Sequence, residues 1–471
     1  MSTTKYTPLH NLPPLAGIAD FDAARRPGLS VEESVRRLKR FHYALCRLHE
    51  IFVARITAEP IYELKMGFSL HAHYCAEHVS ALRSRVGEMR EPPLGLEVVP
   101  DENLAIFFDE IISAPETPLL LAGIYGKAVP AITVAMENYR AVVNPLADAP
   151  GLRVLRFALL ELQDMAEYGA KALKSLKGGD DAAWLALLDR CLAASGGLDG
   201  TAPAHMQKIA RSFSVQPYRY DPVPQRDERF PDPYNMGVNA EVFLHDPAMT
   251  APPKCLMMYY RRIREIDVPE MMASIITETR GKPWNYYRDM TRQLWDEARH
   301  AMMGEVGFVD LGVDWRKVMI NFTWSLGLNT QLTAKERHGV LYFIEQGQMP
   351  KTGKRYEWEV ALMAENKLAA TFQDFDWADE VLHARVGRDW YVSEFTNAKD
   401  AVEWGDHCWS KVLIGWREWR DKGLTTHRNW WPEVYRAACE NWGIKPDAAV
   451  LAYKETYETK RADLKVIEAS A

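Results

Sequence analysis

Apolar residues recur at intervals of three and four through most of this chain, and this spacing constrains its fold more than any other feature. The spacing places apolar side chains on one face of an α-helix, whereas a half-buried strand alternates apolar and polar residues. Alternating runs of β-branched residues are few. With 471 residues, of which 47% are hydrophobic, the chain can bury a large core. We therefore predict an all-α protein with more than one domain.

A proline-rich stretch, QPYRYDPVPQRDERFPDPYN at 216–235, interrupts the helical pattern near the middle of the chain. Proline lacks a backbone N–H and cannot continue a helix, so this stretch should form an ordered loop or linker. The expected organisation is an N-terminal helical domain (1–200), a Pro-rich linking or wrapping segment (201–254), a helical bundle (255–395) and a Trp-rich C-terminal helical extension (396–471).

Charge and cysteine content exclude several classes of protein. The net charge of −7 gives no basic field for nucleic acid, and the six cysteines are scattered without a Cys-x-x-Cys pair, which favours a reducing cytoplasm. The longest apolar run, 119–136, contains Lys127 and Pro130 and is too short to cross a bilayer. No glycine-rich phosphate-binding motif is present, so we assign no organic cofactor site. We expect a cytoplasmic protein without membrane or nucleic-acid partners.

Two four-residue patterns carry the chemistry, Glu297-Ala-Arg-His300 and Glu380-Val-Leu-His383. Each lies in a helical stretch, where residues three apart share one face and can bind the same ion. They are the only Glu-x-x-His pairs in the chain. A four-helix bundle can hold two iron or manganese ions with such a pair on each of two helices and one glutamate on each of the other two. The two pairs therefore predict a dinuclear metal site.

The expected lengths of two helices predict which glutamate is the first additional ligand. Gly281-Lys282-Pro283 should join helices 268–280 and 284–309 as an antiparallel pair. Glu270 then lies at about the same height as Glu297, whereas Glu278 lies too near the turn and Glu265 falls before Pro269. We predict Glu270 as the third carboxylate.

The second additional glutamate should come from the expected helix 314–347. A loop at 347–355 would join this helix to the expected helix 357–390, which carries Glu380. Glu345 would lie almost in that loop, so Glu336 is the nearest glutamate that can reach the ions, provided that a kink at 374–376 closes the difference in height. The predicted metal ligands are thus Glu270, Glu297, His300, Glu336, Glu380 and His383.

A weak internal repeat relates the two halves of the chain. Aligning Glu50 with Glu270 also aligns Glu77 with Glu297, but Ser80 then takes the place of His300. The N-terminal domain would be a duplicated bundle that has lost its imidazoles. A rival metal site remains open there, formed by His71, His73, Glu77 and His78, with satisfied core polar groups as the ordinary alternative.

The ordered set Glu270, Glu297 with His300, Glu336, and Glu380 with His383 resembles the ferritin-like di-iron carboxylate superfamily over residues 262–392. The run DFDWADEVLHARVGRDW, 374–390, looks like the last ligand helix of poorly characterised bacterial members. The resemblance implies a ferritin-like four-helix bundle with two Fe ions, or an Mn/Fe pair, and O₂ as co-substrate. It implies an oxidase or monooxygenase that oxidises a small organic substrate with electrons from a separate donor.

The resemblance assigns no catalytic residue beyond the metal ligands. Several neighbouring charged residues can orient the ligands, although each can equally be an exposed helix charge: Asp296, Arg299, Asp376, Asp379 and Arg385. The alternative function is a non-catalytic metal-binding or dimerising helical scaffold, and a homodimer fits either interpretation. An enzyme should consume O₂ after ferrous loading, whereas a scaffold should not.

Overall fold

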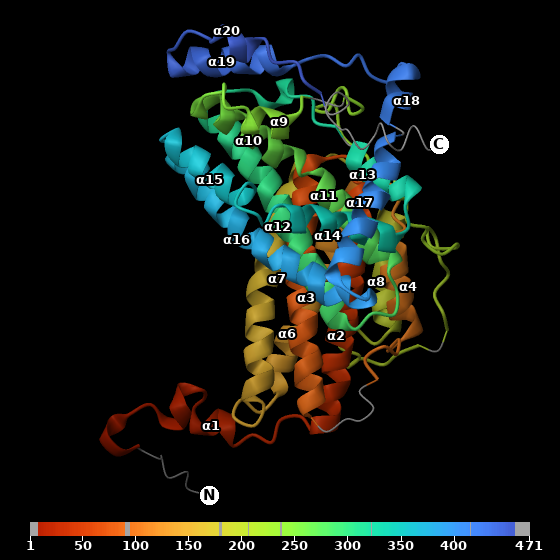
Figure 1. Cartoon of the computed structure of the whole chain (residues 1–471). Coiled ribbons are helices and arrows are strands. Elements are labelled where there is room, and N and C mark those ends of the chain that lie inside the picture. Colours follow the sequence, from red (N-terminus) through yellow and green to blue (C-terminus); the bar gives the residue numbers. More distant parts are fainter. Residues whose placement is uncertain are drawn as a thin grey trace, which may run out of the picture. The chain divides into compact units, whose positions relative to one another are not determined.

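The computed structural model describes residues 8–89, 95–178, 181–205, 207–235, 238–321, 323–414 and 416–456. These residues form helices joined by turns and loops, and none of them forms a β-strand (Figure 1). The prediction of an all-α protein is confirmed, and the helices assemble as bundles.

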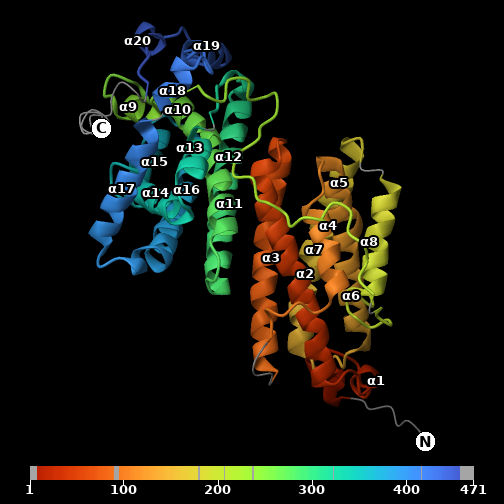
Figure 2. The ribbon, with the colours of Figure 1, turned by 90° about the vertical axis from the view of Figure 1, so that its right-hand side faces the viewer.

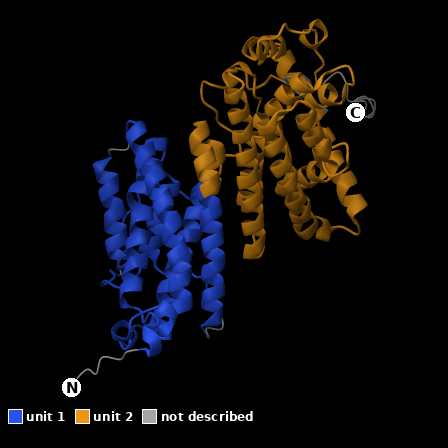
Figure 3. Ribbon diagram, turned by 90° about the vertical axis from the view of Figure 1, so that its left-hand side faces the viewer, with its two compact units in different colours: residues 1–52, 71–219 blue, residues 53–70, 220–471 orange. Residues whose placement is uncertain are grey.

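The chain divides into two compact units (Figure 3). Unit 1 comprises Met1–Phe52 and His71–Arg219, and unit 2 comprises Val53–Leu70 and Tyr220–Ala471. The division differs from the expected domains in two ways. It falls inside the expected segment 201–254, and the turn between the first two long helices belongs to unit 2. The expected bundle and the Trp-rich extension lie together in unit 2.

The long helices of unit 1 run side by side (Figure 2). Unit 1 contains α1 (Phe21–Ala24), most of α2 (Val31–Ala58) and α3 (Tyr62–Glu88), α4 (Glu102–Ile112), α5 (Thr117–Leu121), the π-helical segment η3 (Ala122–Ala128), α6 (Val129–Val142), α7 (Ala149–Ser175) and α8 (Ala182–Ala194), with short 3₁₀ turns η1 (Leu9–Asn11) and η2 (Pro14–Gly17). Aspartate side chains cap four of these helices by accepting from backbone N–H groups of the first turn: Asp20 for α1, Asp101 for α4, Asp148 for α7 and Asp181 for α8.

One helical stretch of the described chain, Thr117–Val142, is long and apolar enough to cross a membrane. Within its most apolar window, 67% of the residues are buried inside the protein. The core helix of a soluble protein has the same length and composition, so a single stretch of this kind is weak evidence for a membrane span. The burial is compatible with a soluble protein.

Unit 2 carries the Glu-x-x-His helices. It contains α9 (Ala240–His245), α10 (Ala251–Arg264), α11 (Asp267–Glu278), α12 (Trp284–Asp310), η4 (Trp315–Lys317), α13 (Thr323–Gln331), α14 (Ala334–Gly347), α15 (Lys354–Met363), α16 (Lys367–Trp390), η5 (Val392–Glu394), α17 (Ala398–Ile414), α18 (Trp416–Asp421), α19 (Trp431–Trp442) and α20 (Ala448–Leu451). The expected helix 314–347 is divided into η4, α13 and α14, and the expected helix 357–390 into α15 and α16. Thr333 caps the start of α14, and Asn366 caps the start of α16.

Helices α10 and α12 approach each other closely, and two glycines on α12 make this possible. A Cβ atom at Gly304 would lie 2.3 Å from the backbone nitrogen of Ile263, and one at Gly307 would lie 2.2 Å from the Tyr259 ring. Any side chain there would force the helices apart. Helix α16 packs against α12, α14 and α15, and α11 packs against α12 and α14. Helices α11, α12, α14 and α16 therefore form a ring in unit 2, and α10 packs beside α12 and α15.

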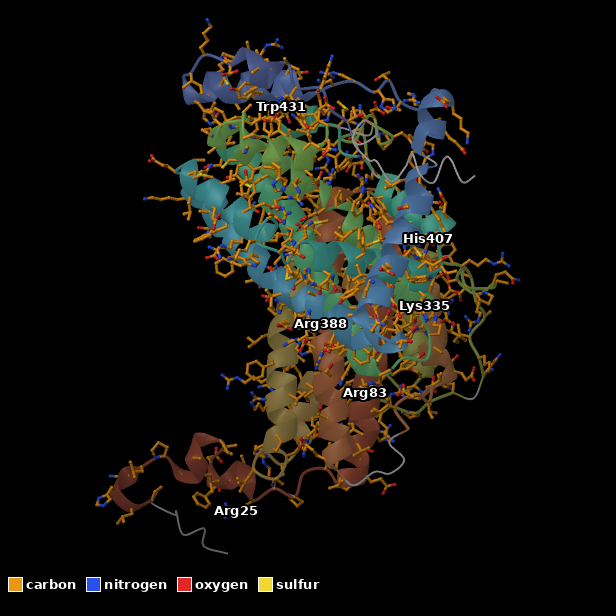
Figure 4. The ribbon with its side chains drawn as sticks, in the orientation of Figure 1. Arg25, Arg83, Lys335, Arg388, His407 and Trp431 are labelled. Atoms are coloured by element: carbon orange, nitrogen blue, oxygen red, sulfur yellow. The ribbon has the colours of Figure 1, made fainter. Side chains whose placement is uncertain are left out.

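The tryptophans of α19 act as packing residues. Trp430 and Trp431 are fully buried, and the Trp430 ring lies 4.5 Å from that of Tyr260 on α10. The indole N–H of Trp431, labelled in Figure 4, donates to the Val450 carbonyl at 2.9 Å. The C-terminal helices are therefore part of the core of unit 2.

Candidate metal centre

Six side chains from four helices of unit 2 converge on one buried point. Glu265 directly follows α10, Glu297 and His300 lie on α12, Glu345 lies in the last turn of α14, and Glu380 and His383 lie on α16. Ligand atoms of Glu297, Glu345, Glu380 and His383 all lie within 4.8 Å of one another, and so do those of Glu265, Glu297 and His300. Glu297 belongs to both groups. The arrangement therefore offers two adjacent ion positions that share one carboxylate.

The imidazole nitrogens lie close to the carboxylates of this cluster, and His300 Nδ1 also lies 3.3 Å from Asp376 Oδ1. His383 Nδ1 lies 3.1 Å from Glu297 Oε1 and 3.7 Å from Glu380 Oε2. His300 Nδ1 lies 3.4 Å from Glu297 Oε2 and 3.5 Å from Glu265 Oε2. Both imidazoles are fully buried, and the Glu265 side chain is the most accessible member at 19%. The spacing suits donors that surround a small cation.

Five of these atoms are buried and lack a partner in hydrogen-bond geometry: Glu265 Oε2, Glu297 Oε1, His300 Nδ1, Glu380 Oε2 and His383 Nδ1. A buried polar atom without a partner costs free energy, so a set of them in one place requires an explanation. Two cations, one in each group, would satisfy all five atoms. The residues present thus fit a pair of divalent ions.

Two aspartates determine which imidazole nitrogen faces the cluster. His300 Nε2 lies 3.2 Å from Asp379 Oδ2, and His383 Nε2 lies 3.4 Å from Asp296 Oδ2. The two Nδ1 atoms are therefore left to face the carboxylates. Arg299 donates to Asp379 at 2.7 Å and also contacts Asp296. These contacts place Asp296, Arg299 and Asp379 in the orienting positions expected from the sequence, whereas Arg385 is exposed.

The electrostatics of the cluster are those of crowded ionisable groups. Burial and the charge of Glu380 raise the pKa of Glu345 well above its ordinary value. Burial opposes ionisation of Glu297, but the adjacent imidazoles of His300 and His383 hold its pKa at about 2. Burial likewise opposes charging of His300, yet the charge of Asp376 and the contact with Asp379 raise its pKa well above the ordinary value. Carboxylates and imidazolium groups thus balance one another across the cluster.

Lys354 supplies a buried cation at one edge of the cluster. Its ammonium lies 2.8 Å from Glu380 Oε1 and 2.9 Å from Asp376 Oδ2. Arg262 also contacts Asp376 and lies 2.8 Å from Glu265 Oε1. His300, Asp376 and Glu380 form a third group that can hold an ion, and Lys354 already neutralises two of its members.

No family model, curated protein or solved structure matches this chain. The assignment of the site therefore rests on its own geometry.

The structure brings together four of the six ligands predicted from the sequence, Glu297, His300, Glu380 and His383. It places Glu270 elsewhere. Glu270 is fully buried on α11, where Lys65 Nζ lies 2.9 Å from its Oε1 and the Ser325 hydroxyl donates to its Oε2 at 2.6 Å. Arg226 also binds this carboxylate. The prediction is corrected because Lys65, Arg226 and Ser325 bind the Glu270 carboxylate away from the cluster. Glu265, which directly follows α10, lies beside Glu297 and His300 instead.

Glu336 also lies outside the cluster. It sits in the first turn of α14, where its carboxylate accepts from the Thr333 N–H at 2.8 Å in a capping box. Glu345 in the last turn of the same helix takes its place. The correction has a physical reason: α15 is inserted between α14 and α16, so the end of α14 meets the middle of α16 rather than its start.

The rival histidine cluster of unit 1 does not form a metal group. Among the described residues, all three groups that can hold an ion lie in unit 2. His71 Nδ1 lies 2.7 Å from the Tyr125 hydroxyl, and burial lowers the pKa of His71 to about 3. His78 Nε2 lies 2.6 Å from Glu161 Oε2. His71 is therefore a core polar group with a hydrogen-bond partner, and His78 faces the Glu161 carboxylate outside hydrogen-bond geometry.

A cavity of about 80 Å³ reaches the centre. Four of the converging carboxylates line it, Glu265, Glu297, Glu345 and Glu380. Its remaining walls come from α9, α10, α11, α13, α14 and α15: Glu241, Arg261, Arg264, Asp267, Val268, Trp324, Ile344, Gln348 and Lys354. A molecule of a few non-hydrogen atoms can therefore approach the ion positions from one side.

Proposed function

We propose that unit 2 holds two divalent metal ions, iron or an Mn/Fe pair, and that the protein is a non-haem oxidase or monooxygenase acting on a small organic substrate with O₂. The observation that carries the proposal is the cluster of five buried, unpartnered ligand atoms from α12, α16 and the residue that follows α10, with Glu345 of α14 beside them. Their order along the chain is Glu265, Glu297 with His300, Glu345, and Glu380 with His383. This order matches that of ferritin-like di-iron carboxylate proteins. We therefore propose a ferritin-like bundle made of α11, α12, α14 and α16, with Glu265 supplied from the end of α10.

The donor set suits such a pair of ions in charge and in kind. Four glutamates balance the charge of two divalent cations, and imidazole and carboxylate are ligands that iron and manganese accept. When bound, the ions supply open positions at which dioxygen can be bound and reduced. The chain's own residues hold the imidazoles through Asp296 and Asp379 and bury the ligands away from bulk water.

The cavity favours catalysis over a metal-binding scaffold. Structural metal sites are closed by their ligands, whereas catalytic sites keep an accessible position. Here the cavity touches four carboxylate ligands, and its partly exposed rim leads to the surface. A separate electron donor belongs to this proposal, because no nucleotide-binding motif was found in the sequence.

The test compares matched variants after anaerobic ferrous loading and desalting. We expect about two ions per chain in the wild type, as in other sites of this design. The His300→Ala/His383→Ala variant should lose them, whereas His10→Ala/His407→Ala, outside the cluster, should keep them. Glu345→Gln should weaken binding, and Glu336→Gln on the same helix should not. Equal metal content in all of these proteins would contradict the metal assignment.

A second measurement separates the enzyme from the scaffold. The ferrous wild-type protein is exposed to O₂ and its consumption is followed with an electrode, together with the optical spectrum. O₂ uptake that disappears in the His300→Ala/His383→Ala variant supports oxidation at this site. Retention of both ferrous ions without O₂ uptake would instead support a metal-binding scaffold.

A further inference from the structure

The cavity beside the metal centre has charged side chains at its entrance. Its floor is buried and carries the ligands together with Lys354, whereas its rim is partly exposed. The rim presents one cationic side chain, Arg264, alongside Val268, Trp324, Ile344 and Gln348. A substrate that enters therefore passes an arginine and several apolar groups before it reaches the carboxylates.

Two arginines one turn apart on α10 converge at this entrance on a single carboxylate oxygen. Arg261 Nε lies 3.4 Å and Arg264 Nη2 lies 3.5 Å from Glu241 Oε1. Both distances are at the long limit for a charge-assisted hydrogen bond. The Glu241 side chain is 40% exposed, whereas those of Arg261 and Arg264 are 10% and 12% exposed. Glu241 is therefore the one member of this trio that water can readily solvate.

The other cations at the cavity have firm, buried partners. Lys354 is held by Asp376 and Glu380, and the second partner of Arg261 is the buried Glu357. Four ligand glutamates would be balanced by two divalent ions. Arg264 also lies over the Tyr260 ring, with its Cζ 5.6 Å from the ring centroid. Of the charged groups beside it, Glu241 is the exposed carboxylate whose place an incoming carboxylate can take.

We infer that the substrate carries a carboxylate group, which displaces Glu241 and binds between Arg264 and Arg261 at the entrance of the cavity. A planar guanidinium is well matched to a carboxylate, and Glu241 is the intramolecular stand-in for it. Val268, Trp324 and Ile344 form an apolar wall for the remainder of the molecule. This inference rests on the proposed function, because it takes the metal centre as the end of the cavity where the substrate reacts.

The size of the cavity limits the part of the substrate that fits inside. A cavity of about 150 Å³ admits a benzene molecule, and this one measures about 80 Å³. The enclosed part of the substrate is therefore smaller than a benzene ring. A short aliphatic carboxylate is the appropriate probe.

The experiment uses Zn²⁺-loaded full-length protein, because zinc has no redox chemistry and separates binding from oxidation. Butyrate, butanol and butylammonium, each at millimolar concentration, are compared by saturation-transfer difference NMR and titration. We expect butyrate alone to bind. Arg264→Gln should weaken butyrate binding about tenfold, the usual effect of losing one charge-assisted hydrogen bond. Glu241→Gln should instead strengthen binding several-fold, because it removes the internal competitor.

The matched controls are Arg316→Gln and Asp314→Asn, which alter an exposed arginine–aspartate pair joined at 2.9 Å outside the cavity. Both should leave butyrate binding unchanged, and circular dichroism confirms that each variant is folded. Equal binding of butanol, or butyrate binding that is unaffected by Arg264→Gln and Glu241→Gln, would overturn the inference. Direct coordination of butyrate to the metal predicts that unaffected result.

The two proposals fail in different ways. A protein that binds butyrate through Arg264 but consumes no O₂ after ferrous loading contradicts the proposed function and retains the anion site. A protein that consumes O₂ but shows no dependence of butyrate binding on Arg264 and Glu241 retains the proposed function and loses this inference.

Discussion

Asp379 on α16 contacts His300 on α12 through an Nε2 to Oδ2 separation of 3.2 Å, and the reverse pairing is also present. Asp296 on α12 lies 3.4 Å from His383 on α16. In each helix the aspartate directly precedes the ligand glutamate, so that both carry the pattern Asp-Glu-x-x-His. Each helix therefore supplies one ligand pair and orients the histidine of the other. The centre is locally two-fold symmetric in its chemistry, although the helices are far apart in the sequence.

The reciprocal contacts predict the effect of removing one carboxylate charge. Asp379→Asn should weaken metal binding about 10- to 100-fold, because loss of an orienting partner frees the imidazole and lowers its basicity. Affinity is measured by competition with a chelator at fixed pH. Asp374→Asn, on the exposed face of the same helix, is the control and should bind metal like the wild type. Equal affinities for the two variants would mean that Asp379 does not orient His300.

The close approach of α10 and α12 predicts that Gly304 is essential for stability. In Gly304→Ala the new Cβ would meet the Ile263 nitrogen at 2.3 Å, and such overpacking costs about 1–3 kcal/mol of unfolding free energy. Metal affinity should fall as well, since α10 positions Glu265. Chemical denaturation and metal titration measure the two effects. Gly347→Ala has no atom within 4 Å of the new Cβ and should leave both quantities unchanged.

The sequence revealed those parts of the site that depend on local spacing. Glu297 with His300 and Glu380 with His383 were found because both members of each pair lie on one turn of one helix. The remaining carboxylates depend on which helices become neighbours, which spacing does not determine. Glu270 and Glu265 both lie upstream of α12, and their partners distinguish them, because Lys65, Arg226 and Ser325 bind Glu270 whereas Glu265 faces His300.

One missed signal was present in the sequence. Thr333-Ala-Lys-Glu336 is a capping-box sequence, which marks a helix start and engages Glu336 in that cap. Reading it would have divided the expected helix 314–347 and excluded Glu336 as a ligand. Asn366 is a second such signal, because it caps α16 and separates that helix from α15. With both breaks placed, Glu345 becomes the remaining glutamate in the second half of α14.

Lys354 provides a prediction that links stability to metal binding. Lys354→Met removes the buried cation from Asp376 and Glu380, and such a loss typically costs about 3–5 kcal/mol. The metal-free variant should therefore unfold at lower denaturant concentration. Metal should restore more stability to the variant than it adds to the wild type, because the ion then replaces the countercharge that Glu380 has lost.

The readout for Lys354 is the difference between the metal-induced shifts in unfolding midpoint of the two proteins, measured with Zn²⁺. Lys335→Met, which removes a lysine that is 51% exposed on α14, is the matched control and should show the wild-type shift. A Lys354→Met variant that is destabilised equally with and without metal would show that this lysine is only a packing residue. That result would not contradict the assignment of the metal ligands.

Buried histidines in unit 1 predict how stability depends on pH. Burial lowers the pKa of His42 and His49 to about 4 and that of His71 to about 3. The unfolded chain, with ordinary values near 6.5, binds more protons between these limits, so unfolding is favoured as the pH falls. Stability should be fully present above about pH 6.5 and should decrease towards pH 4, by up to about 1.4 kcal/mol per pH unit for each histidine.

Urea unfolding at pH 7.5, 6 and 5 measures how the free energy of unfolding changes with pH. His49→Gln should reduce the dependence of unfolding free energy on pH by the contribution of one buried histidine. His205→Gln, at an exposed position, should leave this dependence unchanged. Identical slopes in the two variants would show that His49 does not remain uncharged in the folded protein.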